Sequence, residues 1–408
     1  MTNEYTSRKE FIFLVALLTA MVAMSIDTML PAIGTIAQEF GVSDPNQRQY
    51  IITSFFGGMT VGTLVSGPIS DSAGRKPTIF AGLLLFLAGS ALCLFATSFD
   101  MMLWGRALQG FGAAAPRIVS MAMVRDGQSG AAMARIMSFV MSVFMLVPIL
   151  APSIGQLVLL VADWRMIFVG LLGMAIFAAI FLEVRQEETL PRDKRVRFSA
   201  GNLYRSALEF FRFPAAWGYT VAVGFVFAAF ISYLGTSQQI FAEQYAQGKL
   251  FAVWFGLFAV AIAMAMIFNG RMVMRYGMRV LSKWAVRGCI LFAAMFLVVA
   301  LMYAGHPPLW TLGLYLFATF FCCGILFGNY NAMAMEPVGH IAGMAAAISG
   351  TLSSLVAIGI GTWIGQQYDG TILPLVYGYL SMGILALLFS EYAEYAKAKM
   401  VKNPRLVD

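Results

Sequence analysis

The stretch FIFLVALLTAMVAMSIDTMLPAIGTIA, residues 11–37, holds a single charged residue, Asp27, among apolar and small side chains. It is long enough to cross a bilayer, which needs about 20 mostly apolar residues in a helix. An ionisable group in hydrocarbon costs several kcal/mol on insertion scales, so an acid there predicts a functional site. Pro31 has no N–H to pair with the carbonyl of Asp27, and we expect the helix to bend there. A titratable group beside a bend suits a part that binds a proton and moves. The alternative is an acid that only pairs with a cation on a neighbouring helix.

The composition extends this interpretation to the whole chain of 408 residues. Hydrophobic residues make up 60% of the chain and charged residues 12%, whereas charged residues alone reach about 25% in soluble domains. Stretches long and apolar enough to cross a membrane recur from end to end. They cover residues 11–37, 48–70, 78–97, 100–124, 136–161, 166–184, 216–240, 250–270, 284–304, 309–333, 344–368 and 374–392. We therefore predict an all-α integral membrane protein with twelve transmembrane helices.

The lysines and arginines predict the orientation of these helices. When the N-terminus, the loops after even-numbered helices and the C-terminal tail are placed on the cytoplasmic side, that side receives most of the 27 lysines and arginines. The opposite side receives Arg48, Arg165 and Lys249. This asymmetry follows the positive-inside rule and predicts that both termini are cytoplasmic. The net charge of +7 is then a consequence of topology, and we expect no nucleic-acid partner.

The chain is predicted to form two six-helix halves joined by a polar linker, the layout of a transporter built from two similar halves. Residues 1–184 form the first half, 185–215 the cytoplasmic linker, 216–392 the second half and 393–408 a cytoplasmic tail. The linker segment NLYRSALEFFRF, residues 202–213, has apolar residues at helical spacing and suits a helix on the membrane surface. A weak repeat relates the turns after the second and eighth helices, where Gly67, Gly74 and Lys76 match Gly270, Gly277 and Arg279.

The turn GPISDSAGRK, residues 67–76, resembles the loop signature G-x-L-x-D-R-x-G-R-K of the major facilitator superfamily. Its glycines allow a sharp turn, and its charges can pair with each other and with helix ends. The resemblance implies that Asp71 and Arg75 latch the two halves together on the cytoplasmic side. The other members that we assign to this gate are Gly67, Gly74 and Lys76. Ser72 stands where the signature has an arginine, which removes one ionic partner.

Two further segments narrow the resemblance. RALQG, residues 106–110, is similar to the R-x-x-Q-G signature of the fourth helix, and PILAPSIG, residues 148–155, is similar to the G-P-x-x-G-G signature of proton-coupled drug exporters. Ala151 and Gln156 replace two glycines of the latter. Pro148 and Pro152 each free a backbone carbonyl, so we expect a bend there, and Gly155 allows close helix packing. Together with IDTMLPAI and ADWRMIF, these segments resemble most the Bcr/CflA-type drug-resistance transporters.

The fourth predicted helix carries two arginines, Arg106 and Arg117, which are eleven residues apart. At about 100° per residue they share one face of the helix, roughly 16 Å apart along its axis. Buried arginines must face protein or water, so we expect Arg106 to pair with Asp27, with Arg117 deeper toward the cytoplasm. In the superfamily that the chain resembles, the first and fourth helices both line the central cavity. The alternative for each arginine is a cation that only supports packing.

The remaining polar residues of the spans offer candidates for substrate contact. They are Tyr233, Gln238, Gln239, Asn329 and Asn331. Each of them could equally make a hydrogen bond between helices. The four cysteines fit no metal-site spacing and both histidines fall in loops, so we expect no metal. We also expect no cofactor other than the proton as coupling ion.

We interpret the chain as a proton-driven antiporter of the bacterial inner membrane that exports small amphipathic drugs or metabolites. No phosphate-binding loop G-x-x-x-x-G-K-[ST] occurs, so we expect neither ATP-driven transport nor enzymatic activity. Because Asp27 is the one acid deep in a span and two arginines stand against it, we expect neutral or anionic substrates. The expected partners are a small-molecule substrate and membrane lipid, and we expect a monomer. Two alternatives remain, namely a proton-coupled symporter that imports a small organic solute and a membrane receptor that transports nothing.

Overall fold

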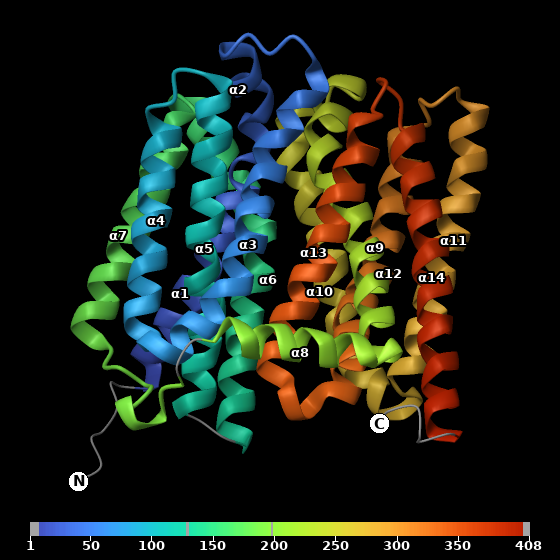
Figure 1. Ribbon diagram of the computed structural model, residues 1–408. Helices are drawn as coiled ribbons and strands as arrows, with labels where there is room; N and C mark the ends of the chain where they lie inside the picture. The colour runs from blue at the N-terminus through green and yellow to red at the C-terminus, as the bar shows by residue number, and fades with distance from the viewer. Residues whose placement is uncertain (1–7, 128–129, 197–198, 403–408) are drawn as a thin grey trace. The chain divides into compact units, whose positions relative to one another are not determined.

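The computed structural model describes residues 8–127, 130–196 and 199–402 (Figure 1). Within these ranges every regular element is helical. The chain divides into two compact units, Met1–Ser199 and Ala200–Asp408. Part of the predicted cytoplasmic tail, residues 403–408, lies outside the described residues, as do residues 1–7.

The first unit is built around α5, which packs along both α3 and α4. Glycines bring these helices close together, because a methyl group on Gly110 of α5 would lie 1.9 Å from the carbonyl oxygen of Phe55 in α3. The helices of this unit are α1 (Arg8–Asp27), η1 (Leu30–Ala32), α2 (Ile33–Glu39), η2 (Pro45–Gln49), α3 (Tyr50–Ala73), α4 (Arg75–Leu94), α5 (Phe99–Gly127), α6 (Gly130–Val161), α7 (Arg165–Arg185) and η3 (Arg192–Lys194).

The second unit is centred on α9, which packs against α13, α14 and α12. It also contains α8, which runs crosswise to α9 and α13 (Figure 1). The π-helix η4 continues α9 directly. The helices of this unit are α8 (Ala200–Arg212), α9 (Pro214–Gln238), η4 (Gln239–Gln244), η5 (Gly248–Leu250), α10 (Phe251–Tyr276), α11 (Met278–Met302), α12 (Leu309–Met335), η6 (Glu336–Ile341), α13 (Ala342–Gln366) and α14 (Leu373–Lys402).

Each predicted span overlaps a long helix, the first also covers η1 and α2, and at the predicted bend beside Asp27 the helix is interrupted. α1 ends at Asp27, and after a short turn the chain resumes in η1, which contains Pro31, and in α2. α6, in contrast, remains one helix through Pro148 and Pro152. The linker segment expected to be helical forms α8.

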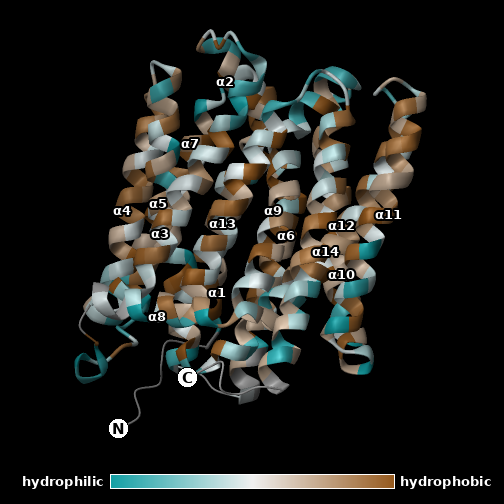
Figure 2. Cartoon of the chain, turned by 45° about the vertical axis from the view of Figure 1, so that its right-hand side comes forward, coloured by the Kyte–Doolittle hydropathy of each residue, from teal (hydrophilic) through white to brown (hydrophobic). Residues whose placement is uncertain are grey.

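The surface of the described helices is suited to lipid. Large apolar side chains such as Trp104, Leu160, Val161 and Trp310 are exposed, which is far more than a soluble monomer tolerates. Hydrophobic residues dominate the middle of the long helices, and hydrophilic residues gather toward their ends (Figure 2). Among the described residues, ten helical stretches are long and apolar enough to cross a membrane, and one of them spans both α12 and α13. The chain is therefore a multi-pass membrane protein.

α5 is not among these ten stretches. It is the least hydrophobic of the described helices of twenty or more residues, because it carries Arg106, Gln109 and Arg117 within its length. α5 packs against α3 and α4, and polar residues inside such a helix are candidates for a functional site.

Candidate functional site

Asp27 lies at the last position of α1, where the helix breaks. Its side chain is only 6% exposed, and it makes no hydrogen bond or ion pair with any described residue. The neighbouring hydroxyl groups do not donate to this carboxyl group. Those of Ser25 and Thr28 both donate to backbone carbonyls of α1, at 2.7 and 2.6 Å. An ionised carboxylate held in this position without a partner is costly, so the carboxyl group is an unusual feature of this helix end.

Arg106 lies on α5 and has no exposed surface. Its Nε donates to the carbonyl of Ile51 at 3.2 Å, and its Nη1 donates to the carbonyl of Ser25 at 3.1 Å and to Oε1 of Gln109. The guanidinium also stands over the ring of Phe55, with Cζ 4.6 Å from the ring centroid. Its Nη2 has no hydrogen-bond partner among the described residues.

The expected ion pair between Asp27 and Arg106 is therefore not formed in this structure. The guanidinium instead donates to the carbonyl of Ser25, two residues before Asp27. The carbonyls of Ser25 in α1 and Ile51 in α3 lie where the planar guanidinium directs its Nη1 and Nε donors. Gln109 continues this network by donating to the hydroxyl of Ser90 in α4 at 2.8 Å. The structure thus brings Arg106 to the last turn of α1, with one buried nitrogen of Arg106 left without a partner and the carboxyl of Asp27 not ion-paired.

Gly155 of α6 packs directly on the break that follows Asp27. A methyl group on Gly155 would lie 2.1 Å from the carbonyl oxygen of Thr28 and 3.1 Å from Cγ of Pro31. One turn earlier, Ala151 packs with Ala20 and Ala23 of α1. The segment that resembles the drug-exporter signature therefore packs directly against the interrupted helix through Ala151 and Gly155, and we call these two residues the seat of the break. The glycine at 155 was the sequence signal for close packing, but its partner could not be read from the sequence.

Arg117 contacts α3, as Arg106 does, with Nη1 3.8 Å from Sδ of Met59. The two arginines thus share a face of α5, as predicted. Arg117 keeps accessible surface, whereas Arg106 has none, so the expected burial is complete only for Arg106.

The substrate candidates of the second unit have varied surroundings. Tyr233 is fully buried against the rings of Phe255, Phe258 and Phe320, and its hydroxyl has no partner among the described residues. Asn329 forms a reciprocal amide pair with Asn269 of α10, at 2.9 Å in both directions.

The other three candidates lie at a helix end or on an exposed face. Asn331 is exposed and donates to the carbonyl of Phe327 in its own helix. Gln238 ends α9, and Gln239 begins the π-helix and is buried. Because π-helical turns occur frequently at functional sites, Gln238 and Gln239 remain candidates for substrate contact.

The gate residues of the first unit form a network of charges. The guanidinium of Arg75 donates to Asp126 at the end of α5 at 2.7 Å, to the hydroxyl of Ser70 at 2.8 Å, and to Asp71. Lys76 pairs with Glu183 of α7 at 3.1 Å. The turn itself is shorter than expected, because α3 continues through Gly67 to Ala73. Gly74 alone makes the turn, with a φ of 111° that side chains rarely adopt.

Glu188, which the sequence did not point to, completes this network. Its carboxylate accepts hydrogen bonds from the backbone N–H groups of Arg75 and Lys76, at 3.0 and 3.2 Å, and so caps the N-terminus of α4. A methyl group on Gly74 would lie 2.5 Å from this carboxylate, so the glycine also makes room for the cap. The sequence signal would have been an acid close after the sixth helix, which is common in any polar linker.

The second unit repeats part of this arrangement. Arg279, the counterpart of Lys76, pairs with Glu394 of α14 at 2.8 Å and with Glu336 at the start of η6 at 2.7 Å. The preceding Gly277 has a φ of 79°, as Gly74 has a positive φ in the first unit. Met274 stands in place of Asp71, so the ion pairs within the turn are confined to the first unit. The weak repeat in the sequence thus corresponds to a shared pattern in both units, namely a glycine with positive φ followed by a cation that pairs with the last long helix of its unit.

Comparison with known proteins agrees with this architecture. Residues 14–362 match the family model described as Major Facilitator Superfamily. An uncharacterized MFS-type transporter, YdgK of Bacillus subtilis, is 28% identical over 89% of this chain and 90% of its own length. A bicyclomycin resistance protein homolog of Haemophilus influenzae is 26% identical over 95% of this chain and 96% of its own length. The multidrug resistance protein MdtL of Citrobacter koseri is 31% identical over 41% of this chain and 42% of its own length.

Solved structures share the fold at low sequence identity. A crystal structure of a D-xylose-proton symporter superimposes with a TM-score of 0.74 at 14% identity, covering 94% of this chain and 97% of the symporter. The human organic anion transporter MFSD10 superimposes with a TM-score of 0.68 at 16% identity, covering 95% of this chain and 99% of that chain. With a family model that covers most of its length, the chain belongs to the Major Facilitator Superfamily of membrane transporters.

Proposed function

We propose that this protein is a proton-driven antiporter of the bacterial inner membrane that exports small amphipathic, neutral or anionic compounds from the cytoplasm. The observation that carries the proposal is the carboxyl group of Asp27, which is buried at a helix break and has no partner among the described residues. Arg106 donates a hydrogen bond to the carbonyl of Ser25, two residues before this break. The names of two relatives, a bicyclomycin resistance protein homolog and a multidrug resistance protein, support export of drugs.

The proposed topology has twelve spans with both termini in the cytoplasm. The spans are α1, α3, α4, α5, α6 and α7 in the first unit and α9 to α14 in the second. α5 is included although it is too polar to qualify by hydropathy, because α3 and α4 cover much of it. The excess of lysine and arginine in the loops assigned to the cytoplasm supports this orientation.

In the proposed cycle, Asp27 binds a proton when water from the outside reaches the helix break. Protonation removes the charge and with it the cost of keeping an unpaired carboxylate among apolar side chains. On the inner side the proton leaves, and the ionised carboxylate gains a cation when Arg106 exchanges a backbone carbonyl for it. The unpartnered Nη2 of Arg106 gives the guanidinium a free donor for this exchange.

The driving force is sufficient for such a cycle. One charge that moves across 100 mV yields about 2.3 kcal/mol. Since about 1.4 kcal/mol corresponds to a tenfold concentration ratio, one proton per neutral substrate sustains a gradient of roughly fiftyfold.

We assign the remaining residues to two further roles. Gly67, Asp71, Gly74, Arg75 and Lys76 control closure of the cytoplasmic side, and the α6 segment with Pro148, Pro152 and Gly155 transmits movement of the break. Substrate contact is assigned to Arg117 and Tyr233, and to Gln238 and Gln239 at the π-helical junction. Asn329 and Asn331 are weaker candidates, because their amides already bond to Asn269 and to the backbone.

The test is uphill transport by Asp27→Asn, with Asp27→Glu as the matched control that keeps a titratable group. Inverted vesicles that contain the purified protein are given a pH gradient, and both chloramphenicol uptake and substrate-induced proton release are measured. We expect Asp27→Asn to bind chloramphenicol but to lose gradient-driven uptake and proton release, while Asp27→Glu retains part of both. Full uphill transport by Asp27→Asn would place the coupling site elsewhere. Proton movement in the same direction as the substrate would identify a symporter instead.

A further inference from the structure

α8 is fastened to its unit along one side. Phe210 is completely buried in a cluster with Ala216, Val338 and Ala345, and Phe213 packs against the same cluster. Glu209 pairs with His340 of η6, whose ring lies 6.4 Å from that of Phe213. These contacts hold α8 against α9 and α13 and fix which of its faces points outward.

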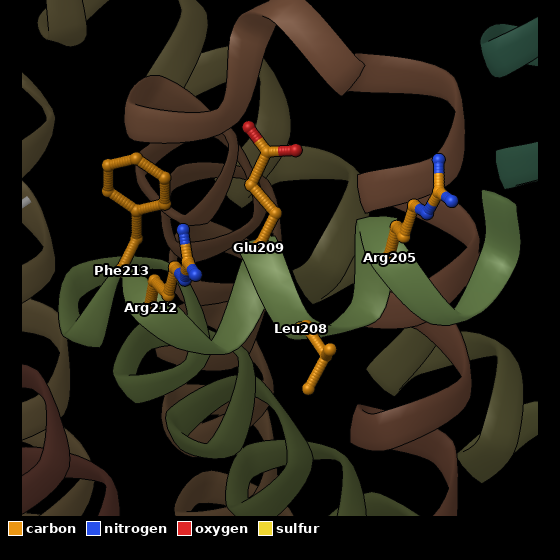
Figure 3. A pocket seen from close by; sticks show the side chains of 5 residues that line it. All are labelled: Arg205, Leu208, Glu209, Arg212 and Phe213. Atoms are coloured by element: carbon orange, nitrogen blue, oxygen red, sulfur yellow. The ribbon is translucent and has the colours of Figure 1, made fainter. Parts of the chain in front are cut away.

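The outward face of α8 is apolar. Tyr204, Leu208 and Phe211 are 66%, 50% and 50% exposed. Their spacing of four and three residues places them within about 60° of each other around the helix. Figure 3 shows Leu208 projecting to the side of α8 opposite to Glu209. Three large apolar side chains on one exposed stripe require an apolar partner.

Two cations lie beside this stripe, on the side of α8 to which Glu209 projects (Figure 3). Arg205 and Arg212 are seven residues apart and therefore lie on one side of α8. Both are exposed, and neither makes a hydrogen bond or ion pair within the described part of the chain. They line a surface hollow together with Leu208, Glu209 and Phe213 (Figure 3).

The position of α8 along the chain identifies the partner. α8 ends at Arg212, and a stretch apolar enough to cross a membrane begins at Pro214. The end of α8 therefore lies at a membrane boundary. The rings of Trp217 and Tyr392 contact each other near this boundary, with centroids 5.4 Å apart and planes tilted by 42°, and such aromatic residues are enriched at the level of lipid headgroups.

We propose that α8 is a binding site for an anionic phospholipid. Arg205 and Arg212 bind its phosphate groups, and its acyl chains cover Tyr204, Leu208 and Phe211. An amphipathic helix with an apolar stripe and cations along one side of it is suited to this position in the membrane surface. The inference needs the chain to lie in a membrane, but it does not depend on the direction or energy source of transport.

The first experiment measures where Leu208 lies. The variant Leu208→Cys is labelled with a nitroxide, which is selective because the four native cysteines are buried. The full-length protein is placed in vesicles of phosphatidylcholine with 30% phosphatidylglycerol, and collisions with oxygen and with a water-soluble nickel complex are compared. Arg192→Cys, exposed in the linker outside α8, is the aqueous reference. Greater access to oxygen than to nickel at position 208 supports the proposal. A water-accessible label at 208 overturns it and favours a soluble protein as the partner of this face.

The second experiment tests the two cations. Phosphatidylglycerol bound to the detergent-solubilised protein is titrated by native mass spectrometry for Arg205→Gln with Arg212→Gln. The control is Arg192→Gln with Lys194→Gln, which removes the same charge from exposed linker positions. Each basic residue at an anionic surface contributes roughly fivefold in affinity, so we expect a loss of about 25-fold for the α8 pair and little change for the control. Equal losses in both variants would reduce the effect to net charge and overturn a defined site.

Discussion

Gly155→Ala tests whether the break beside Asp27 is held by α6. The added methyl group would lie 2.1 Å from the carbonyl oxygen of Thr28, whereas ordinary contact begins at 3.4 Å. The two groups must therefore separate by more than about 1 Å. Overpacking of this kind costs about 1–3 kcal/mol in a closely packed interior. The shift occurs one residue from Asp27, and a displacement of about 1 Å at a reacting group lowers rates by about a hundredfold.

The control is Gly173→Ala in α7, where a methyl group would meet no atom within 4 Å. Both variants are purified, and thermal unfolding and gradient-driven chloramphenicol uptake are compared with the parent protein. We expect Gly155→Ala to lower the unfolding midpoint by several degrees, at roughly 2–4 °C per kcal/mol for a unit of this size. Uptake by this variant should fall by at least tenfold, whereas Gly173→Ala should match the parent in both measurements. If Gly155→Ala transports at the parent rate with an unchanged midpoint, the proposed seat has no functional role.

Three further predictions concern charges. Glu188→Gln should destabilise the first unit by about 1–2 kcal/mol, because the N-terminus of α4 loses a charged cap, and thermal unfolding of this variant beside Glu187→Gln measures the difference. Arg75→Ala and Asp71→Asn should slow transport and increase labelling of cysteines introduced on the cytoplasmic side, and unchanged labelling in both variants would rule out their role in closure. Arg117 should disfavour cationic substrates, so resistance to tetraphenylphosphonium should be weak relative to resistance to chloramphenicol and should rise in Arg117→Ala. Strong resistance to the cation that survives this substitution unchanged would contradict the assignment.

The sequence alone determined the class of protein and the positions of its helices. A composition this apolar requires lipid around the chain, and each predicted stretch corresponds to a long helix because a membrane span needs continuous helical hydrogen bonding. The interruption at Asp27 was predictable for the same local reason, since Pro31 removes the hydrogen bond that would have continued α1. The shared face of Arg106 and Arg117 followed from helical periodicity.

The contacts between helices were decided by the tertiary structure. Sequence reasoning paired Arg106 with Asp27, whereas the guanidinium bonds to the carbonyls of Ser25 and Ile51. It did not anticipate that Gly155 meets Thr28 or that Glu188 caps α4 across more than a hundred residues. Periodicity states which way a side chain points, but a hydrogen bond forms or fails within a few tenths of an ångström. That distance depends on how closely whole helices approach one another, and the approach is set by packing that no single stretch of sequence contains.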